Sequence, residues 1–182
     1  MVRWNIAAVV GVPGVGKTSL CKSAAMARGY SYVNYGDLML GEALSQNLAS
    51  NKDEMFKLGL EDQHSIWKAA ALKVKELTVD NILLDLHGVD RSPSGYIISL
   101  PIEFINPDII ILVESSYDNI IHRRKDDKSR NRPLESKETV NEYMNFLRIT
   151  MVNCSIICGS YLKVLENDDL EGCLNELEYI IG

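Results

Sequence analysis

Eight residues near the N-terminus have the types and the spacing needed to hold a polyphosphate. They read Gly11-Val12-Pro13-Gly14-Val15-Gly16-Lys17-Thr18 and match the pattern G-x-x-x-x-G-K-[ST]. The glycines let successive backbone N–H groups turn toward phosphate oxygens. The N-terminus of a following helix adds further N–H groups and the positive end of its dipole. The motif predicts a nucleoside triphosphate site whose ATP contacts come from Gly11, Val12, Pro13, Gly14, Val15, Gly16, Lys17, Thr18 and Ser19.

Two side chains of this loop and one distant carboxylate carry the remaining donor chemistry. Lys17 can reach the β- and γ-phosphates, and the Thr18 hydroxyl can ligate Mg²⁺. Asp85 ends the apolar run Ile82-Leu83-Leu84, where a carboxylate orients Mg²⁺ or its waters. Capping of a following helix is the alternative role for Asp85. We expect Thr18 and Asp85 to hold Mg²⁺, directly or through water.

A run of cations between Arg123 and Arg132 is unusual in this chain. It contains six cations within ten residues of a protein whose net charge is −6. Phosphoryl transfer needs cations on the migrating group and a means of excluding water. We therefore expect a short lid in which Arg123, Arg130 and Arg132 close over the polyphosphate. A solvated charge run, partly neutralised by neighbouring aspartates, is the alternative.

An isolated arginine, Arg91, lies in a loop-like segment that covers residues 85–96. An arginine just beyond a central strand can bind an acceptor phosphate in a bidentate fashion. A plain surface arginine is the alternative. His87, in the same segment, fits a polar wall better than a general base, because a phosphate acceptor is already anionic.

Five apolar strands alternate with helical segments and must position these residues. The strands are expected at Trp4–Val10, Tyr30–Asn34, Asn81–Asp85, Asp108–Val113 and Tyr161–Leu165, and the helices at Thr18–Ala27, Leu38–Leu48, Glu61–Leu77, from near Glu135 onward, and at the C-terminus. This alternation predicts an α/β fold with a five-stranded parallel sheet and helices on both faces. Ligands bind at the carboxyl ends of such strands, where the glycine loop, Tyr35-Gly36-Asp37 and Asp85 all fall.

The overall composition limits the classes of protein. A length of 182 residues, 46% apolar and 24% charged, fits one ordinary soluble domain. The acidic balance argues against general nucleic-acid or membrane binding. The first strand begins too early to leave room for a signal peptide. Four cysteines, expected to be buried thiols, complete the prediction of a cytoplasmic protein: Cys21, Cys154, Cys158 and Cys173.

Six segments in a fixed order carry a resemblance to a known family. They are Gly11–Thr18, Val33-Asn34-Tyr35-Gly36-Asp37-Leu38-Met39, Asp53-Glu54-Met55, Asp85-Leu86-His87, Pro93-Ser94-Gly95-Tyr96 and Arg130-Asn131-Arg132. Many kinases share the first segment, whereas the combination at these intervals is specific. In this combination the chain resembles the archaeal-type adenylate kinases over essentially its whole length.

The resemblance implies the reaction ATP + AMP ⇌ 2 ADP with Mg²⁺, on a P-loop fold of three αβα layers. It implies one nucleoside monophosphate kinase domain over residues 1–182, with an acceptor segment at about 35–60 and a lid at about 123–133. Its implied contacts are Lys17 for ATP phosphates, Tyr35, Gly36 and Asp37 for AMP, Arg91 for the AMP phosphate, and Arg123, Arg130 and Arg132 for the lid. Such enzymes are commonly homotrimers.

A helix that is apolar on two sides is compatible with an oligomer. Val140, Met144, Leu147 and Met151 form one stripe, and Ile149, Val152 and Ile156 form another. A helix of this kind needs two partners, and the second is either a neighbouring subunit or another part of the same monomer.

Two segments depart from the family pattern, and both fall in the acceptor half. Phe56 stands where the family reads arginine, and Ile97-Ile98-Ser99-Leu100-Pro101 replaces Leu-Pro-Gly-Leu-Pro. A kinase for another nucleoside monophosphate or small acceptor is therefore the main alternative. A non-catalytic ATP-binding module is another. A GTPase switch is a further alternative, supported only by the likeness of Asn51-Lys52-Asp53-Glu54 to the guanine-binding motif Asn-Lys-x-Asp. This segment precedes the third strand and so lacks the structural context of that motif.

Overall fold

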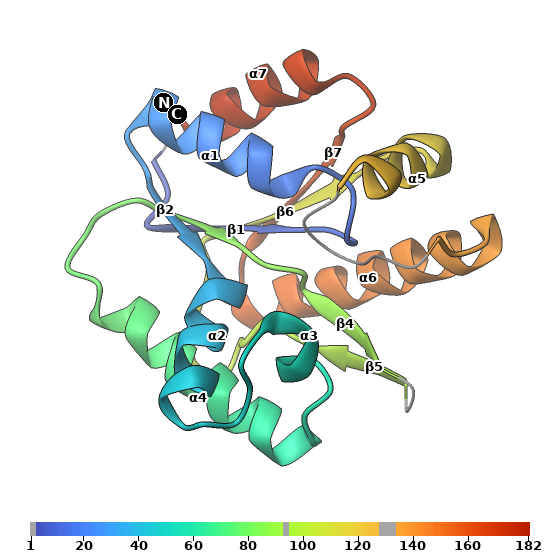
Figure 1. Ribbon diagram of the computed structural model, residues 1–182. Coiled ribbons are helices and arrows are strands. Elements are labelled where there is room, and N and C mark those ends of the chain that lie inside the picture. The colour runs from blue at the N-terminus through green and yellow to red at the C-terminus, as the bar shows by residue number, and fades with distance from the viewer. Residues whose placement is uncertain (1–2, 93–94, 128–133) are drawn as a thin grey trace.

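The computed structural model describes residues 3–92, 95–127 and 134–182. Arg130 and Arg132, two of the expected lid cations, lie outside these ranges. Five strands form one parallel sheet in the order β2-β3-β1-β6-β7 (Figure 1). They are β1 (Ile6–Val10), β2 (Ser31–Asn34), β3 (Ile82–Asp85), β6 (Ile109–Glu114) and β7 (Tyr161–Glu166). The expected five-stranded parallel sheet is confirmed.

Helices cover both faces of the sheet. Figure 1 shows α1 (Lys17–Arg28) and α7 (Leu170–Ile181) together on one face, and α6 (Lys137–Cys158) on the other. The helices α2 (Tyr35–Ser45), α3 (Lys52–Met55) and α4 (Leu60–Glu76) pack on the same side as α6, and α5 (Tyr117–Asp126) precedes α6 in the chain. Because both faces are covered, the central strands β1 and β6 consist of buried apolar residues except at Ile6 and Glu114, which are partly buried.

Helix α2 begins earlier than the sequence indicates. The Asn34 side chain accepts a hydrogen bond from the backbone N–H of Asp37 (3.0 Å) and thereby caps the helix. Tyr35-Gly36-Asp37 consequently form the first helical turn directly after β2 rather than a loop. This places their backbone at the carboxyl end of the sheet.

The segment that was expected to be a loop contains a β-hairpin, so that expectation is wrong. Strands β4 (Val89–Ser92) and β5 (Gly95–Ile98) pair antiparallel outside the main sheet. Helix α6 supports the hairpin, because Tyr143 donates to the Val89 carbonyl (2.6 Å) and Phe146 stacks on Tyr96 at 4.4 Å. These partners lie some fifty residues away, so the local pattern could not reveal them.

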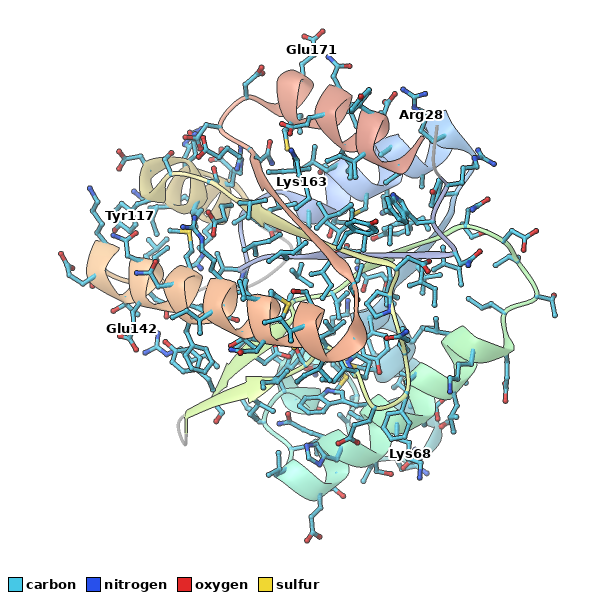
Figure 2. The ribbon with its side chains drawn as sticks, turned by 180° about the vertical axis from the view of Figure 1, so that it is seen from behind. Arg28, Lys68, Tyr117, Glu142, Lys163 and Glu171 are labelled. Carbon is cyan, nitrogen blue, oxygen red and sulfur yellow. The ribbon has the colours of Figure 1, made fainter. Side chains whose placement is uncertain are left out.

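Helix α6 buries only one of its two apolar stripes. Val140, Leu147 and Met151 are buried against the rest of the chain. Ile149 is 64% exposed and Ile156 is 73% exposed. Burial inside the monomer therefore does not explain the second stripe. Figure 2 shows α6 and β7 on the side of the molecule that faces the viewer when the structure is seen from behind.

Three of the four cysteines are buried, so the expectation of buried thiols is confirmed in part. Cys21, Cys154 and Cys173 are buried, as expected, whereas Cys158 is half-buried. Burial raises the pKa of the Cys173 thiol to about 11, so it stays protonated at neutral pH. Among the helices that the structure describes, none is both long enough and apolar enough to cross a bilayer.

Replacement of Ile111 by alanine tests how much the central sheet contributes to the free energy of unfolding. Ile111 is fully buried in β6, so Ile111→Ala should lower the free energy of unfolding by about 2–5 kcal/mol, because it leaves a cavity. Urea denaturation measures this change. The matched variant Met26→Ala, at an 86% exposed position on α1, should stay within about 0.5 kcal/mol of wild type. Equal effects at both positions would contradict the described core.

Candidate functional site

A cleft of about 280 Å³ lies at the carboxyl ends of β1, β2 and β3. On one side it is lined by Pro13, Gly14, Gly16, Lys17, Thr18, Ser19, Arg123 and Asp127. On the other side it is lined by Asn34, Tyr35, Gly36, Met39, Lys52, Phe56, Leu86, His87, Asp90 and Ser99, with Asp85 between the two. One cavity thus joins the glycine loop to the segment that follows β2.

The glycine loop has a backbone that side chains would disturb. Gly14 (φ +98°) and Gly16 (φ +93°) are left-handed, and Gly16 caps α1. A Cβ atom at Gly11 would lie 2.5 Å from the carbonyl oxygen of Val113. The Gly11 N–H donates to the His87 carbonyl (3.2 Å), which holds the start of the loop against the chain leaving β3. The sequence therefore needs glycine at these positions for this loop shape.

Lys17 is buried at the base of the loop. Its Nζ donates to the carbonyl oxygens of Gly11 (2.5 Å) and Val12 (3.5 Å). Only 6% of Lys17 is exposed, so the ammonium has a fixed position in the cleft lining. A phosphate oxygen is a stronger acceptor than these neutral carbonyls, because the hydrogen bond is then charge-assisted on both sides.

The Asp85 carboxylate lies between the loop and β2. Its Oδ2 atom accepts hydrogen bonds from Thr18 Oγ1 (2.8 Å), Tyr32 OH (3.0 Å) and Asn34 Nδ2 (3.0 Å). The sheet register brings them together, because Asp85 pairs with Val9 on one side and Asn34 on the other. Burial and the nearby Asp85 charge raise the pKa of Tyr32, which keeps its hydroxyl a donor.

The chemistry of this donor set fits Mg²⁺. Thr18 and Asp85 offer a hydroxyl and a carboxylate oxygen side by side next to the glycine loop. Mg²⁺ prefers oxygen ligands and is usually held by one or two carboxylates together with substrate phosphates. The two residues that the sequence indicated for the metal are therefore in contact.

Two arginines of α5 hold the glycine loop by its carbonyl groups. Arg123 lines the cleft and donates to the carbonyl of Val15 (3.2 Å). Arg124 is only 5% exposed, and its Nε donates to the carbonyl of Pro13 (3.0 Å). Sequence reasoning selected Arg123 and passed over Arg124, since adjacent residues at a helix end give no local sign of which one turns inward.

Asn167, just after β7, is a further residue that sequence reasoning missed. Its Nδ2 donates to the Val15 carbonyl (2.6 Å), and its own carbonyl accepts from Arg123 (2.6 Å). Next to it, Asp168 accepts hydrogen bonds from Ser116 N–H and Ser115 Oγ (both 2.7 Å), which lower the pKa of Asp168 to about 2. The rule that ligands gather at carboxyl ends of strands could have pointed to this polar pair.

Two of the four expected acceptor contacts line the cleft, and two do not. Tyr35 and Gly36 line the cleft. Asp37 forms an ion pair with Lys52 (2.5 Å) and is largely exposed. Arg91 lies on β4 and does not belong to the cleft lining; its Nη1 pairs with Glu135 Oε1 (2.5 Å), while Arg124 pairs with Glu135 Oε2 (2.8 Å).

The two departures from the family pattern meet at one end of the cleft. The Phe56 ring stacks on the His87 ring with centroids 5.9 Å apart and planes 21° apart. His87 Nδ1 lies 2.7 Å from Asp90 Oδ1. Ser99 is buried beside them, and its N–H donates to the carbonyl of Gly88 (2.9 Å). Phe56 and Ser99 therefore line the same cleft as His87, although they are 43 positions apart in the chain.

A substitution at Gly16 tests the loop as a phosphate site. In Gly16→Ala the new Cβ would lie 2.6 Å from Asn167 Nδ2 at a strained φ of +93°. The Kd for ATP, measured by calorimetric titration, should rise about tenfold or more, which corresponds to about 1.4 kcal/mol. Gly59→Ala is the control, because a Cβ there meets open space at an ordinary φ of −60°. An unchanged Kd in Gly16→Ala would contradict a role of the loop in binding.

Comparison with known proteins identifies relatives that match most of this chain. Residues 10–141 match the AAA domain family AAA_17. An adenylate kinase homolog of Methanothermobacter thermautotrophicus is 47% identical over 90% of this chain and 85% of its own length. An adenylate kinase of Pyrococcus horikoshii is 35% identical over 95% of this chain and 93% of its own.

A solved structure shares the architecture. Shikimate kinase from Acinetobacter baumannii superimposes with a TM-score of 0.61 at 15% identity, covering 97% of this chain and 90% of the other. At that identity the likeness concerns the fold alone. The relatives of 47% and 35% identity are similar over most of both chains. The chain therefore belongs to the archaeal adenylate kinase family.

Proposed function

We propose that the protein is an adenylate kinase that catalyses the reversible transfer of a phosphoryl group from ATP to AMP. One observation carries the proposal: the glycine loop and the acceptor segment line a single continuous cleft. Two nucleotides can then meet end to end, with the donor phosphates at the loop and the acceptor beyond Asp85. Positioning of this kind supplies much of the rate enhancement in phosphoryl transfer.

The donor half of the reaction follows from the loop. The loop residues Gly11–Ser19 bind the ATP phosphates, and Lys17 moves from its carbonyl partners to the β- and γ-phosphates. Thr18 and Asp85 would hold Mg²⁺, which would supply positive charge to neutralise the phosphates when bound. Arg123 lies beside the loop and contributes a cation to the migrating group.

The acceptor half uses the segment of residues 35–60 and the arginines. Tyr35, Gly36 and Asp37 flank the AMP, and Arg91 leaves its ion pair with Glu135 to bind the AMP phosphate. The lid of residues 123–133 brings Arg130 and Arg132 over the phosphates. The acceptor oxygen of AMP is already anionic at neutral pH, so no side chain has to remove a proton from it. The whole chain acts as one nucleoside monophosphate kinase domain.

A kinase for another nucleoside monophosphate is the second candidate. The observation that favours it is the position of Phe56 and Ser99 at the acceptor end, where this chain departs from its family. Turnover of AMP, CMP, GMP and UMP at equal concentration separates the two candidates. Robust turnover of another monophosphate, with no ADP formed from AMP, would overturn the assignment of AMP.

Removal of the Lys17 ammonium tests the enzymatic role of the loop. Lys17→Ala should lower kcat for ADP formation from ATP and AMP by about 100-fold or more, because a buried cation at the migrating phosphoryl group is lost. A coupled assay of ADP release measures this. Lys75→Ala removes an exposed cation from the last turn of α4 and should leave kcat unchanged. Near-normal turnover in Lys17→Ala would refute the role assigned to Lys17.

We also propose that the protein assembles as a homotrimer in the cytoplasm. The exposed apolar residues of α6 and β7 support an interface between copies: Ile149, Val152, Ile156, Ile157, Tyr161 and Val164. Large apolar side chains that gather on one element and remain exposed are typical of subunit interfaces. The protonated, unpaired thiols suit a reducing compartment.

The assembly can be tested by charge insertion on α6. Sedimentation should give three times the chain mass of 20.4 kDa for the wild type, and a single chain mass for the double variant Ile149→Lys, Ile156→Lys. Burying two ammonium groups in an apolar contact is strongly unfavourable. Met26→Lys, at an 86% exposed position on α1, is the control and should not change the mass. A wild-type protein that sediments as a single chain would contradict the proposal.

A further inference from the structure

The hydroxyl of Tyr32 reaches the Asp85 carboxylate from outside the cleft lining. It donates a hydrogen bond to Asp85 Oδ2 (3.0 Å), although Tyr32 itself does not line the cleft. The same oxygen accepts from Thr18 Oγ1 (2.8 Å) and from Asn34 Nδ2 (3.0 Å). Three donors on one oxygen restrict the rotation of the carboxylate. Tyr32 is one of the three, so its hydroxyl helps to set the direction in which Asp85 presents its oxygens.

The other oxygen of Asp85 is the one left for a cation. Within the part of the chain that the structure describes, Asp85 Oδ1 accepts no hydrogen bond and is not among the enclosed, unpaired polar atoms. Asp85 lines the cleft with only 3% of its surface exposed, so this oxygen opens onto the cleft. An anionic oxygen of this kind, beside the Thr18 hydroxyl, suits a hard divalent cation. The orientation of the carboxylate therefore decides where that oxygen lies.

The Tyr32 ring is itself held in a fixed place. Tyr32 and Asn34 are two positions apart on β2, so their side chains project from the same face of the strand. The register with β3 places Asn34 opposite Asp85 and Tyr32 opposite Leu83. Asn34 Nδ2 donates to the Tyr32 hydroxyl (3.3 Å), and the Lys22 ammonium of α1 lies 5.8 Å from the ring centroid. Contacts from β2 and from α1 therefore hold the ring.

We propose that Tyr32 is a positioning residue for the divalent cation that accompanies the donor nucleotide: its hydroxyl holds the Asp85 carboxylate in the orientation that binds the ion. The proposal rests on the proposed kinase function and deepens it at the donor site. Tyr32 acts through Asp85 and touches neither the nucleotide nor the ion. Loss of a hydrogen bond that orients a metal-binding side chain typically weakens metal affinity by about 10- to 100-fold. Because Thr18 and Asn34 remain as donors, we expect the lower end of this range.

The test measures how much the cation strengthens nucleotide binding. The β,γ-imido analogue of ATP is titrated calorimetrically into wild type and Tyr32→Phe, once as its Mg²⁺ complex and once in EDTA. The Kd of the Mg²⁺ complex should rise about tenfold in Tyr32→Phe, because the carboxylate loses one of its orienting bonds. The Kd in EDTA should stay within twofold of wild type, since Tyr32 makes no contact with the nucleotide. An unchanged Kd of the Mg²⁺ complex, or an equal loss with and without the metal, would overturn the proposal.

Tyr30→Phe is the matched control for general damage to the fold. It removes a hydroxyl two positions earlier, where the group donates to the Ile181 carbonyl (2.7 Å) and accepts from the Trp4 N–H (3.0 Å). This variant should lower the Tm, because hydrogen bonds away from the cleft are lost, and should leave both Kd values within twofold of wild type. If Tyr30→Phe weakens the Mg²⁺ complex as much as Tyr32→Phe does, the effect is general and the proposal is wrong.

A double variant tests whether Tyr32 acts through Asp85. In the background of Asp85→Asn, Tyr32→Phe should add no further loss of affinity for the Mg²⁺ complex, because the carboxylate that the hydroxyl orients is already absent. Losses that add in full would mean that the two residues act separately, which contradicts a positioning role. Binding of the analogue in EDTA shows that each variant retains its loop.

These titrations contain no acceptor, so their failure is distinguishable from a failure of the proposed function. If AMP is turned over normally but the Kd of the Mg²⁺ complex is independent of Tyr32, the positioning role is wrong and the kinase assignment stands. If AMP is not turned over but Tyr32→Phe selectively weakens the Mg²⁺ complex, the positioning role is supported in an enzyme with another acceptor. If wild type binds the analogue equally with Mg²⁺ and in EDTA, the role of Tyr32 is overturned.

Discussion

The carboxylate of Asp85 is the interaction on which the arrangement of the cleft depends. A single oxygen accepts hydrogen bonds from Thr18 at the start of α1 and from Tyr32 and Asn34 on β2. Asn34 in turn caps α2. The relative position of the glycine loop and the acceptor segment is thus set by one buried group. Buried carboxylates are tolerated only when their hydrogen-bonding capacity is well used, as it is here.

The glycine loop depends equally on hydrogen-bond donors from the segments that follow β6 and β7. Arg123, Arg124 and Asn167 hydrogen-bond the carbonyl oxygens of Pro13 and Val15. With these carbonyls hydrogen-bonded, the loop has a fixed backbone conformation. The anchors come from the end of α5 and from the turn after β7, so the site is completed by segments more than one hundred residues from the loop in sequence. The loop motif is local in the sequence, but the rigidity of the loop depends on residues far away in the sequence.

The predictable and the unpredictable features differ in how far their physical causes reach along the chain. The loop, the strands and the Thr18–Asp85 pairing follow from local glycine spacing, apolar runs and the rule for strand ends. The β4–β5 hairpin could not be predicted, because its support comes from Tyr143 and Phe146 of α6. The inward turn of Arg124 also depends on a distant partner, the Pro13 carbonyl. Side-chain direction at a helix end is a tertiary property.

Glu135 forms ion pairs with two parts of the molecule, the β4–β5 hairpin and helix α5. Its two carboxylate oxygens bind Arg91 of the hairpin and Arg124 of α5, and Arg124 also holds the Pro13 carbonyl. A continuous chain of polar contacts therefore runs from the hairpin to the glycine loop. Any event that draws Arg91 away leaves the Glu135 charge to Arg124 and changes the electrostatic potential at the loop. Through this one carboxylate, a change at the hairpin alters the free energy of the donor loop. Such a coupling free energy is the thermodynamic condition for communication between two sites.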